Sequence, residues 1–331
     1  MERMVRIKDI AAKANVAPST VSNVLNDSKY VSDEIKARVY EAVEALTYQP
    51  NLLARSLKTK RTSTVGVIIP EFNMFFMEIV DAIERYLYEN GYTMIVCSTS
   101  ENEMKEKKYL DDLVRRFIDG LIFLGMGQNP DEALKDYPVP VVTVDRPVSD
   151  MVPSVTIDNE AGGYQATRHL LERGARHIAL ITGSCKARTN ELRRQGYRRA
   201  LAEFGIAYDE AMEREYDSVN CEVGQQAAKE LFSSGQQIDG LFCDNDFFAA
   251  GAMRYLLGQG IKVPQKVKLA GFDGIPISEM IVPGITTMVQ PKKRMGESAA
   301  GILLRLINGE ALTDGEKHIQ LEAKLEIRES T

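Results

Sequence analysis

Tryptophan is absent from the sequence, which has only three histidines and four cysteines among its 331 residues. The cysteines lie far apart and none belongs to a CxxC pair; they are Cys97, Cys185, Cys221 and Cys243. Structural zinc sites need closely spaced cysteine and histidine ligands, and disulfide frameworks occur in short, cysteine-dense secreted chains. We therefore expect four reduced, mostly buried thiols, no metal and no cofactor.

Long apolar runs are absent as well. No segment approaches the ~20 apolar residues of a membrane-spanning helix, and the N-terminal MERMVRIKDI lacks the apolar run of a signal peptide. The chain is nevertheless too long for a single hydrophobic core. The sequence therefore predicts a cytoplasmic protein of more than one domain that does not bind a membrane.

Positive charge is scarce overall, since the formal net charge is -6, and this balance argues against nucleic acid as a partner. The distribution of this charge along the chain argues for a nucleic-acid partner. Residues 1–61 contain eleven Lys and Arg against seven Asp and Glu, a balance of +4, so the remainder carries -10 (+4 - 10 = -6). A basic head on an acidic body is typical of a phosphate-binding module attached to a second domain. Charge alone also fits a chance asymmetry of the surface.

The first fifty residues have the pattern of three short helices. Apolar residues at helical spacing predict one helix over Ile7–Ala14, and Pro18 suits the first position of a second helix, where its missing N–H costs nothing. Ser32 is the expected N-cap of a third. The polar face of the second helix carries short side chains that can hydrogen-bond base edges in the DNA major groove: Ser19, Thr20, Ser22, Asn23 and Asn26.

A short basic segment follows over residues 50–61. It is compatible with a helix but too short to hold one alone in water, so we expect it to become helical when it docks on phosphates.

The remainder alternates buried strand patterns with helical ones, which predicts parallel sheets of doubly wound type. Ligands of such folds bind at the carboxyl ends of the strands. Aromatic rings and planar polar groups follow the predicted strand ends, and these are the groups that a sugar needs. The candidate effector-binding residues are Asn73, Phe75, Phe76, Asp145, Arg146, Arg193, Asn245, Asp273 and Gln290.

Three stretches, AAKANVAPSTVSNVLN, YQPN and ARSLK, together resemble the LacI/GalR family of bacterial transcription regulators. The resemblance implies a small all-α helix-turn-helix head over residues 1–49, a hinge helix over 50–61 and an effector-binding and dimerisation domain over 62–331. Pro18 and its polar neighbours would then lie on the recognition helix. Leu57 would be a minor-groove wedge flanked by Arg55 and Lys58. Asn23 departs from the family pattern, which commonly has Arg there, and Asn favours adenine over guanine.

The body resembles the periplasmic binding proteins, and its motifs are similar to those of the ribose-binding members: NxFF, a DR pair, a cleft Arg, ND, FDG and a late Gln. This resemblance implies two Rossmann-like lobes, one of about residues 62–158 and 290–318, the other of about 159–289 and 319–331. Phe75 and Phe76 would sandwich the sugar, and the polar candidates would bind its hydroxyls and ring oxygen. Near Val219 the pattern usually has Phe or Trp, a departure that weakens stacking from the second lobe.

The predicted function is a DNA-binding regulator, a repressor of a carbohydrate-utilisation operon controlled by ribose or a similar pyranose. Two heads must be held one helical turn apart, which implies a homodimer on a pseudo-palindromic operator in the bacterial nucleoid. The residues leave induction and co-repression equally open.

Three alternatives stay open at this point. One is a catabolite-control regulator that uses a phosphocarrier protein as co-repressor, and another is a transport binding protein. The third is a sugar-acting enzyme with Asp145 and Asp273 as paired carboxylates. The chain has no GxGxxG after its first strand, no P-loop and no GxSxG before a helix, so we expect no catalytic residues.

Overall fold

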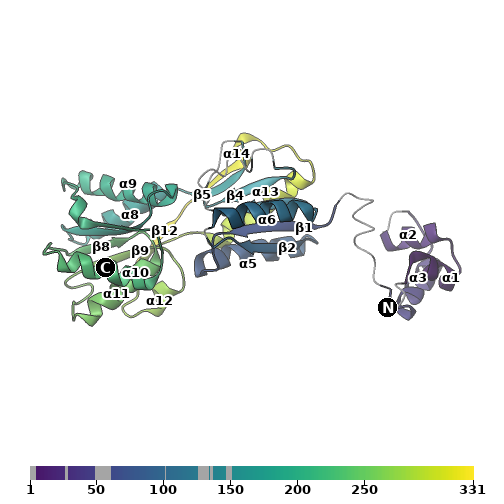
Figure 1. Ribbon diagram of the computed structural model, residues 1–331, viewed down its shortest axis with the longest axis horizontal. Helices are drawn as coiled ribbons and strands as arrows, with labels where there is room; N and C mark the ends of the chain where they lie inside the picture. Colours follow the sequence, from purple (N-terminus) through teal and green to yellow (C-terminus); the bar gives the residue numbers. More distant parts are fainter. Residues whose placement is uncertain are drawn as a thin grey trace. The chain divides into compact units, whose positions relative to one another are not determined.

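The computed structural model describes residues 5–26, 29–48, 61–100, 102–125, 134, 137–146 and 151–331. The chain divides into two compact units, Met1–Thr62 and Ser63–Thr331 (Figure 1). The predicted hinge residues Arg55, Leu57 and Lys58 lie outside the described residues. Among the residues that the structure describes, no helix is long and apolar enough to cross a membrane.

The described residues of the first unit form the helices α1 (Ile7–Ala14), α2 (Pro18–Asn26) and α3 (Asp33–Ala45). Asn15 turns the chain between α1 and α2 at φ 50°, and the Arg38 guanidinium from α3 donates hydrogen bonds to the Ala14 and Asn15 carbonyls at that turn. The core consists of side chains at helical spacing from all three helices and the loop before α3: Ile10, Ala11, Ala14, Val21, Val24, Val31, Val39 and Ala42. Ser32 is the N-cap of α3, as predicted, although its side chain makes no capping hydrogen bond.

The second unit contains two six-stranded sheets, each the centre of one lobe. The first has the order β11-β5-β4-β3-β1-β2 and consists of β1 (Thr64–Ile69), β2 (Thr93–Ser98), β3 (Gly120–Phe123), β4 (Val141–Val144), β5 (Ser154–Ile157) and β11 (His318–Leu321). The second has the order β12-β10-β9-β8-β6-β7 and consists of β6 (Ile178–Gly183), β7 (Glu213–Tyr216), β8 (Gly240–Cys243), β9 (Lys268–Asp273), β10 (Thr286–Val289) and β12 (Lys324–Glu326). The pairs are parallel except β10 with β12.

Helices cover both lobes (Figure 1). The first lobe contains α5 (Met74–Glu89), α6 (Glu103–Arg115), α13 (Lys292–Ile307) and α14 (Asp314–Lys317). The second contains α8 (Asn159–Glu172), α9 (Arg188–Glu203), α10 (Cys221–Ser233), α11 (Asp246–Gly258), α12 (Ile277–Met280) and the 3-10 helix Glu210–Met212. The apolar strands β1, β3, β4 and β8 are buried almost throughout, as expected for parallel strands covered on both faces.

The chain passes between the lobes three times: after β5, after β10 and between β11 and β12. The sequence prediction had placed the last passage at about residue 318. It lies later, because His318–Leu321 pairs in parallel with Ser154–Ile157 in the first sheet. The expectation of mostly buried cysteines also needs correction, since all four are free thiols but only Cys243 is buried and the others are half-buried.

Glycines set the crossing of α8 and α9. A Cβ on Gly163 would lie 2.2 Å from the Arg193 carbonyl oxygen, and one on Gly196 would lie 2.1 Å from the Glu160 carbonyl oxygen. The two backbones are therefore in direct contact. This contact fixes the place of Arg193 relative to the second sheet.

Gly163→Ala should therefore lower the free energy of unfolding by about 1–3 kcal/mol, because α9 must shift to admit the methyl group. Urea denaturation measures the effect. Gly258→Ala is the matched control, since a Cβ there meets nothing within 4 Å and alanine is the better helix former. An unchanged stability of Gly163→Ala would contradict the close crossing.

Candidate functional site

The polar face of α2 is the candidate DNA surface of the first unit. Pro18 and Ser19 are exposed, and Thr20, Ser22 and Asn23 are half-buried, while Val21 and Val24 on the opposite face are buried in the core. The side chain of Asn26 lies outside the described residues. The helix therefore presents short hydrogen-bonding side chains on the side away from its core.

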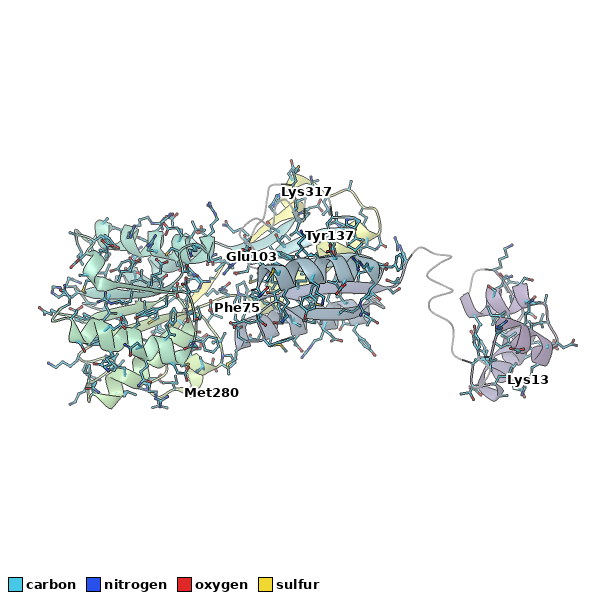
Figure 2. The ribbon with its side chains drawn as sticks, viewed as in Figure 1. Lys13, Phe75, Glu103, Tyr137, Met280 and Lys317 are labelled. Atoms are coloured by element: carbon cyan, nitrogen blue, oxygen red, sulfur yellow. The ribbon has the colours of Figure 1, made fainter. Side chains whose placement is uncertain are left out.

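A cavity of about 110 Å³ lies at the carboxyl ends of strands from both sheets. Eight of the nine predicted effector-binding residues line it: Asn73, Phe75, Phe76, Asp145, Arg146, Arg193, Asn245 and Asp273. Figure 2 labels Phe75 near the junction of the two lobes. The prediction that these side chains come together is met in the geometry. Gln290 is the exception, because it does not line the cavity.

The first lobe contributes an aromatic pair and a carboxylate. Asn73 is the N-cap of α5, where its Oδ1 accepts the Phe76 N–H at 3.0 Å, so this amide is partly occupied by the helix. The rings of Phe75 and Phe76 meet edge to face with centroids 5.2 Å apart. Asp145 follows β4 at φ 70°, a left-handed conformation that is costly for a residue with a Cβ. No described residue donates a hydrogen bond to its buried Oδ1.

Arg193 from α9 is the central cation of the second lobe and is 5% exposed. Its guanidinium lies 3.8 Å from the centroid of the Phe272 ring and 3.3 Å from Asp273 Oδ1. It also donates to Asn159 Oδ1 at 2.8 Å and to the Asp244 carbonyl at 2.6 Å. These contacts hold the group in one orientation at the cavity wall.

Asp273 ends β9 at φ 100° and faces the cavity. Gln290 donates its Nε2–H to Asp273 Oδ1 at 2.8 Å and is 1% exposed. Gln290 therefore supports the Asp273 carboxylate, and its predicted contact with the effector stays a prediction. On α11, Asn245 caps the helix by accepting the Phe248 N–H at 2.8 Å.

Sequence reasoning missed part of the lining. Phe247 supplies an aromatic ring from the second lobe, although Val219 stands where the family pattern usually has an aromatic residue. The signal was present, because Phe247 follows directly on the Asp244-Asn245-Asp246 stretch that ends β8. Further polar side chains of the lining, outside the nine candidates, are Glu71, Ser184, Thr189, Asn190 and Asp217.

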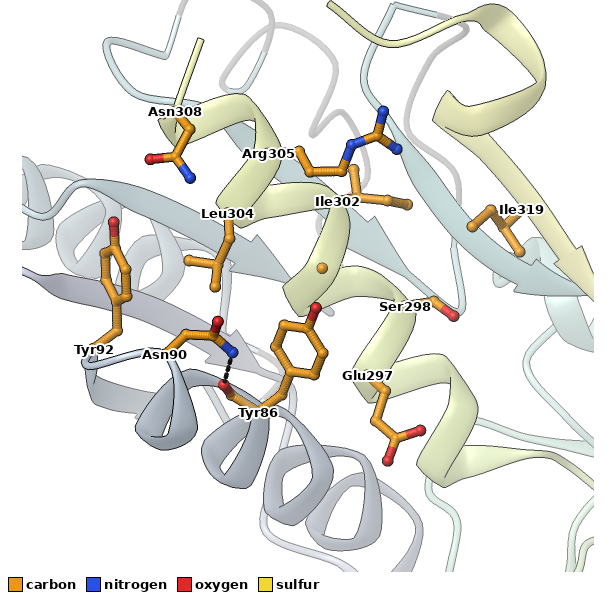
Figure 3. A pocket seen from close by; sticks show the side chains of 11 residues that line it. Tyr86, Asn90, Tyr92, Glu297, Ser298, Ile302, Leu304, Arg305, Asn308 and Ile319 are labelled. Atoms are coloured by element: carbon orange, nitrogen blue, oxygen red, sulfur yellow. Dashed lines mark hydrogen bonds between the residues drawn. The ribbon is translucent and has the colours of Figure 1, made fainter. Parts of the chain in front are cut away.

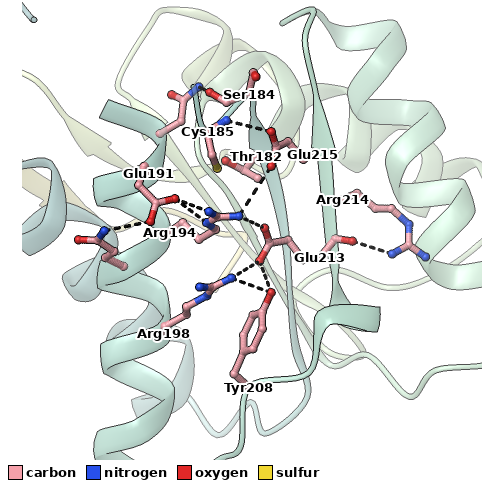
Figure 4. Close-up of polar contacts among 12 residues, drawn as sticks. Thr182, Ser184, Cys185, Glu191, Arg194, Arg198, Tyr208, Glu213, Arg214 and Glu215 are labelled. Atoms are coloured by element: carbon pink, nitrogen blue, oxygen red, sulfur yellow. Dashed lines mark hydrogen bonds and ion pairs between the residues drawn. The ribbon is translucent and has the colours of Figure 1, made fainter. Parts of the chain in front are cut away.

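A charged network fixes the loop that carries Ser184 (Figure 4). Arg194 on α9 pairs with Glu191 on the same helix and, at 3.0 Å, with Glu213 on β7. Glu215 on β7 accepts the Cys185 N–H at 3.0 Å. The edge strand thereby holds both the loop after β6 and the first turns of α9, which line the cavity.

Three buried carboxylates, Asp244, Asp246 and Asp273, lie at the strand ends beside the cavity, and Asp273 is part of its lining. Burial raises the pKa of Asp244 and of Asp273, and in both cases the Arg193 charge opposes the rise. Burial, aided by the Asp273 charge, raises the pKa of Asp246 to about 8. Asp246 supports the loop after β9, because its two oxygens accept from the Thr287 hydroxyl at 2.6 Å and the Ile275 N–H at 2.8 Å.

The raised pKa of Asp246 predicts a pH dependence of stability. The folded state holds the proton more tightly than the unfolded state, so this stabilisation is complete below about pH 4 and is lost as the pH rises through about 8. The loss is at most about 1.4 kcal/mol per pH unit. Asp246→Asn should remove this slope, so its Tm should improve relative to the parent chain between about pH 5 and about pH 8. The exposed Asp81→Asn should keep the parental slope. Parallel Tm curves for parent and Asp246→Asn would contradict the prediction.

A larger and more open cavity of about 690 Å³ lies on the first lobe between α5 and α13 (Figure 3). Tyr86, Asn90 and Arg305 line it, and Asn90 donates to the Tyr86 carbonyl at 2.7 Å. It lies away from the strand ends and lacks buried, converging polar groups. We therefore prefer the smaller cavity as the ligand site.

Comparisons with known proteins agree with this geometry. A family model for periplasmic binding proteins and the sugar binding domain of the LacI family matches residues 62–329, and one for bacterial regulatory proteins of the lacI family matches residues 6–51. The chain is 36% identical over 311 residues to the HTH-type transcriptional repressor PurR of Aliivibrio fischeri, covering 92% of each chain.

Two further proteins are similar over nearly the whole chain. The ribose operon repressor of Halalkalibacterium halodurans is 35% identical over 329 residues, which cover 99% of this chain and 97% of the relative. A solved structure of the lac repressor dimer bound to operator and an anti-inducer superposes with a TM-score of 0.89 at 26% identity, covering 99% of each chain.

Proposed function

Because this chain belongs to the lacI family of bacterial regulatory proteins, we propose that it represses a carbohydrate-utilisation operon and that a neutral sugar, ribose or a similar pyranose, controls it. The chain is a transcription regulator, not an enzyme. The proposal concerns its effector, its operator and its assembly.

Asp145 carries the argument for a hydroxyl-rich effector. A buried carboxylate oxygen without a hydrogen-bond donor is costly, and a ligand hydroxyl at the cavity would satisfy it. Asp273 lies in the same lining on the second lobe and presents a second carboxylate. A sugar supplies several hydroxyl donors for these acceptors, and its C–H face suits the rings of Phe75 and Phe76.

The charge of the lining supports a neutral ligand. Four acidic side chains and two basic ones line the cavity, a formal balance of 2 - 4 = -2; they are Glu71, Asp145, Asp217, Asp273, Arg146 and Arg193. A sugar phosphate would meet this negative potential at close range. The small volume also favours a ligand of monosaccharide size.

A purine is the second candidate effector, because identity to PurR is as high as identity to the ribose operon repressor. A purine would use the aromatic rings of Phe75, Phe76 and Phe247 as stacking surfaces.

The assembly we propose is a homodimer on a pseudo-palindromic operator, in the cytoplasm with the nucleoid. Exposed apolar side chains on the second lobe support a dimer contact: Met280 is 75% exposed and Val282 is 84% exposed. Figure 2 labels Met280 on this lobe. The α2 face reads the major groove through its polar side, which consists of Pro18, Ser19, Thr20, Ser22, Asn23 and Asn26. The hinge residues Arg55, Leu57 and Lys58 act in the minor groove beside it.

Thermal shift against a ligand panel tests the effector. The panel contains D-ribose, other pentoses and hexoses, ribose 5-phosphate, hypoxanthine and guanine. A ligand at about 100 times its Kd adds about 2.7 kcal/mol of stability, which raises Tm visibly. We expect a neutral sugar to act and ribose 5-phosphate to be silent. A shift with purines alone would establish the second candidate instead, and silence of the whole panel would refute a sugar effector.

Operator binding is tested separately by selecting DNA from a random library on the full chain. We expect a pseudo-palindromic consensus that a chain of residues 62–331 fails to retain. Failure to select any consensus at low salt would refute the operator proposal.

A further inference from the structure

Lys292 is a buried lysine at an unfavourable place. It is the first residue of α13, and its side chain is 4% exposed. Lysine is almost never fully buried, and the N-terminus of a helix carries a partial positive charge that disfavours a cation. Specific partners must therefore hold this ammonium group, and they come from both lobes.

The partners in the second lobe are two backbone carbonyls. Lys292 Nζ donates to the Asp273 carbonyl at 2.9 Å and to the Gly274 carbonyl at 2.6 Å. Both residues have left-handed backbone, with φ of 100° and 64°. A Cβ on Gly274 would lie 2.7 Å from Val289 Cα, so the turn packs tightly on β10. The ammonium group therefore binds the backbone of Asp273, the residue whose side chain lines the cavity.

The partner in the first lobe is a carboxylate on α5. Lys292 Nζ lies 3.4 Å from Glu78 Oε2, and the Glu78 side chain is 42% exposed. The same helix carries Phe75 and Phe76 one turn earlier, and these rings line the cavity from the opposite lobe. One cation therefore connects the two elements that face each other across the cavity.

We propose that Lys292 is a positioning residue that couples occupancy of the cavity to the placement of the first lobe. Hydrogen bonds from a ligand to Asp273 restrain the left-handed turn at Asp273 and Gly274. The carbonyls of this turn hold the Lys292 ammonium group. The ammonium group in turn holds α5 through Glu78, and Lys292 itself belongs to α13. The inference rests on the proposed function in taking Asp273 as an effector contact. A purely local structural role would stabilise the chain without joining the two sides.

Hydrogen–deuterium exchange on the full chain without ligand tests the connection directly. In Lys292→Met, we expect amides at the end of β9 and at the start of α5 to exchange at least about tenfold faster. Lys293→Met is the matched control, because the Lys293 side chain is 80% exposed and pairs with Glu297 on its own helix. Glu78→Gln leaves the carbonyl contacts intact and should loosen α5 alone. Faster exchange on one side only in Lys292→Met, or parental exchange on both, overturns the proposal.

The second measurement separates binding from its consequence, with D-ribose as the probe. We expect Lys292→Met to keep the D-ribose Kd within about fivefold, while the ratio of operator affinities with and without D-ribose falls to near one. Lys292→Arg, which keeps a donor cation, should restore part of that ratio. A parental ratio in Lys292→Met overturns the coupling. If the parent chain does not bind D-ribose, the effector assignment fails, and the exchange experiment alone decides the role of Lys292.

Discussion

Arg193→Ala should abolish effector binding and lower the free energy of unfolding by about 3–5 kcal/mol. The guanidinium is stacked on Phe272 and paired with Asp273, and it donates to Asn159 and to the Asp244 carbonyl. Its removal leaves Asp273 as a buried charge without its main partner. It also removes the strongest donor that the second lobe presents to a ligand hydroxyl.

Urea denaturation and thermal shift with the active sugar measure the two effects. Arg199→Ala on the same helix is the control, because this side chain is 49% exposed and pairs with the partly exposed Glu160. It should change the stability by less than about 1 kcal/mol and leave binding intact. Equal losses of unfolding free energy in the two variants would mean that the buried Arg193–Asp273 pair stabilises the fold no more than the exposed Arg199–Glu160 pair does.

Asp145→Asn should separate binding from stability. A hydrogen bond to a charged group is worth about 1.5–3 kcal/mol, so effector affinity should fall about 10- to 150-fold. The free energy of unfolding should not fall, because the substitution removes a buried, unsatisfied carboxylate oxygen. Asparagine also tolerates the left-handed φ of 70° better than most residues.

Isothermal titration with the active sugar and urea denaturation check this prediction. Asp217→Asn makes the same change of charge at an exposed place in the same lining, and it should reduce affinity far less. A clear loss of stability in Asp145→Asn would show that this carboxylate serves the fold and not a ligand.

Much of the candidate site could be predicted from the sequence, because parallel topology brings strand ends together whatever their distance along the chain. Asp145 and Asp273 are 128 residues apart, since 273 - 145 = 128, yet both follow buried strands and both reach the cavity. The direction of a side chain is another matter. Gln290 follows β10 in the same way, but its amide donates to Asp273 and the residue is not part of the cavity lining.

Two strands of the second sheet lack a strong hydrophobic signal. The strand β7 reads Glu-Arg-Glu-Tyr, and β12 has three residues, so neither carries the apolar run by which buried strands are recognised. Lys292 was missed for a related reason. Lysine in a helix predicts an exposed face, and only the tertiary contacts with Asp273, Gly274 and Glu78 account for its burial.

The threefold passage of the chain between the lobes imposes an order of folding during synthesis. The helix α13 and strand β11 belong to the first lobe, but they leave the ribosome after most of the second lobe. The strand β12 and the C-terminal residues of the second lobe follow them. Until then, the apolar faces of α5 and β4 that later pack on α13 remain uncovered, among them Ile79, Ile83 and Val142. The second lobe is an insertion in the first, so the nascent first lobe leaves this apolar surface exposed to solvent while most of the second lobe is synthesised.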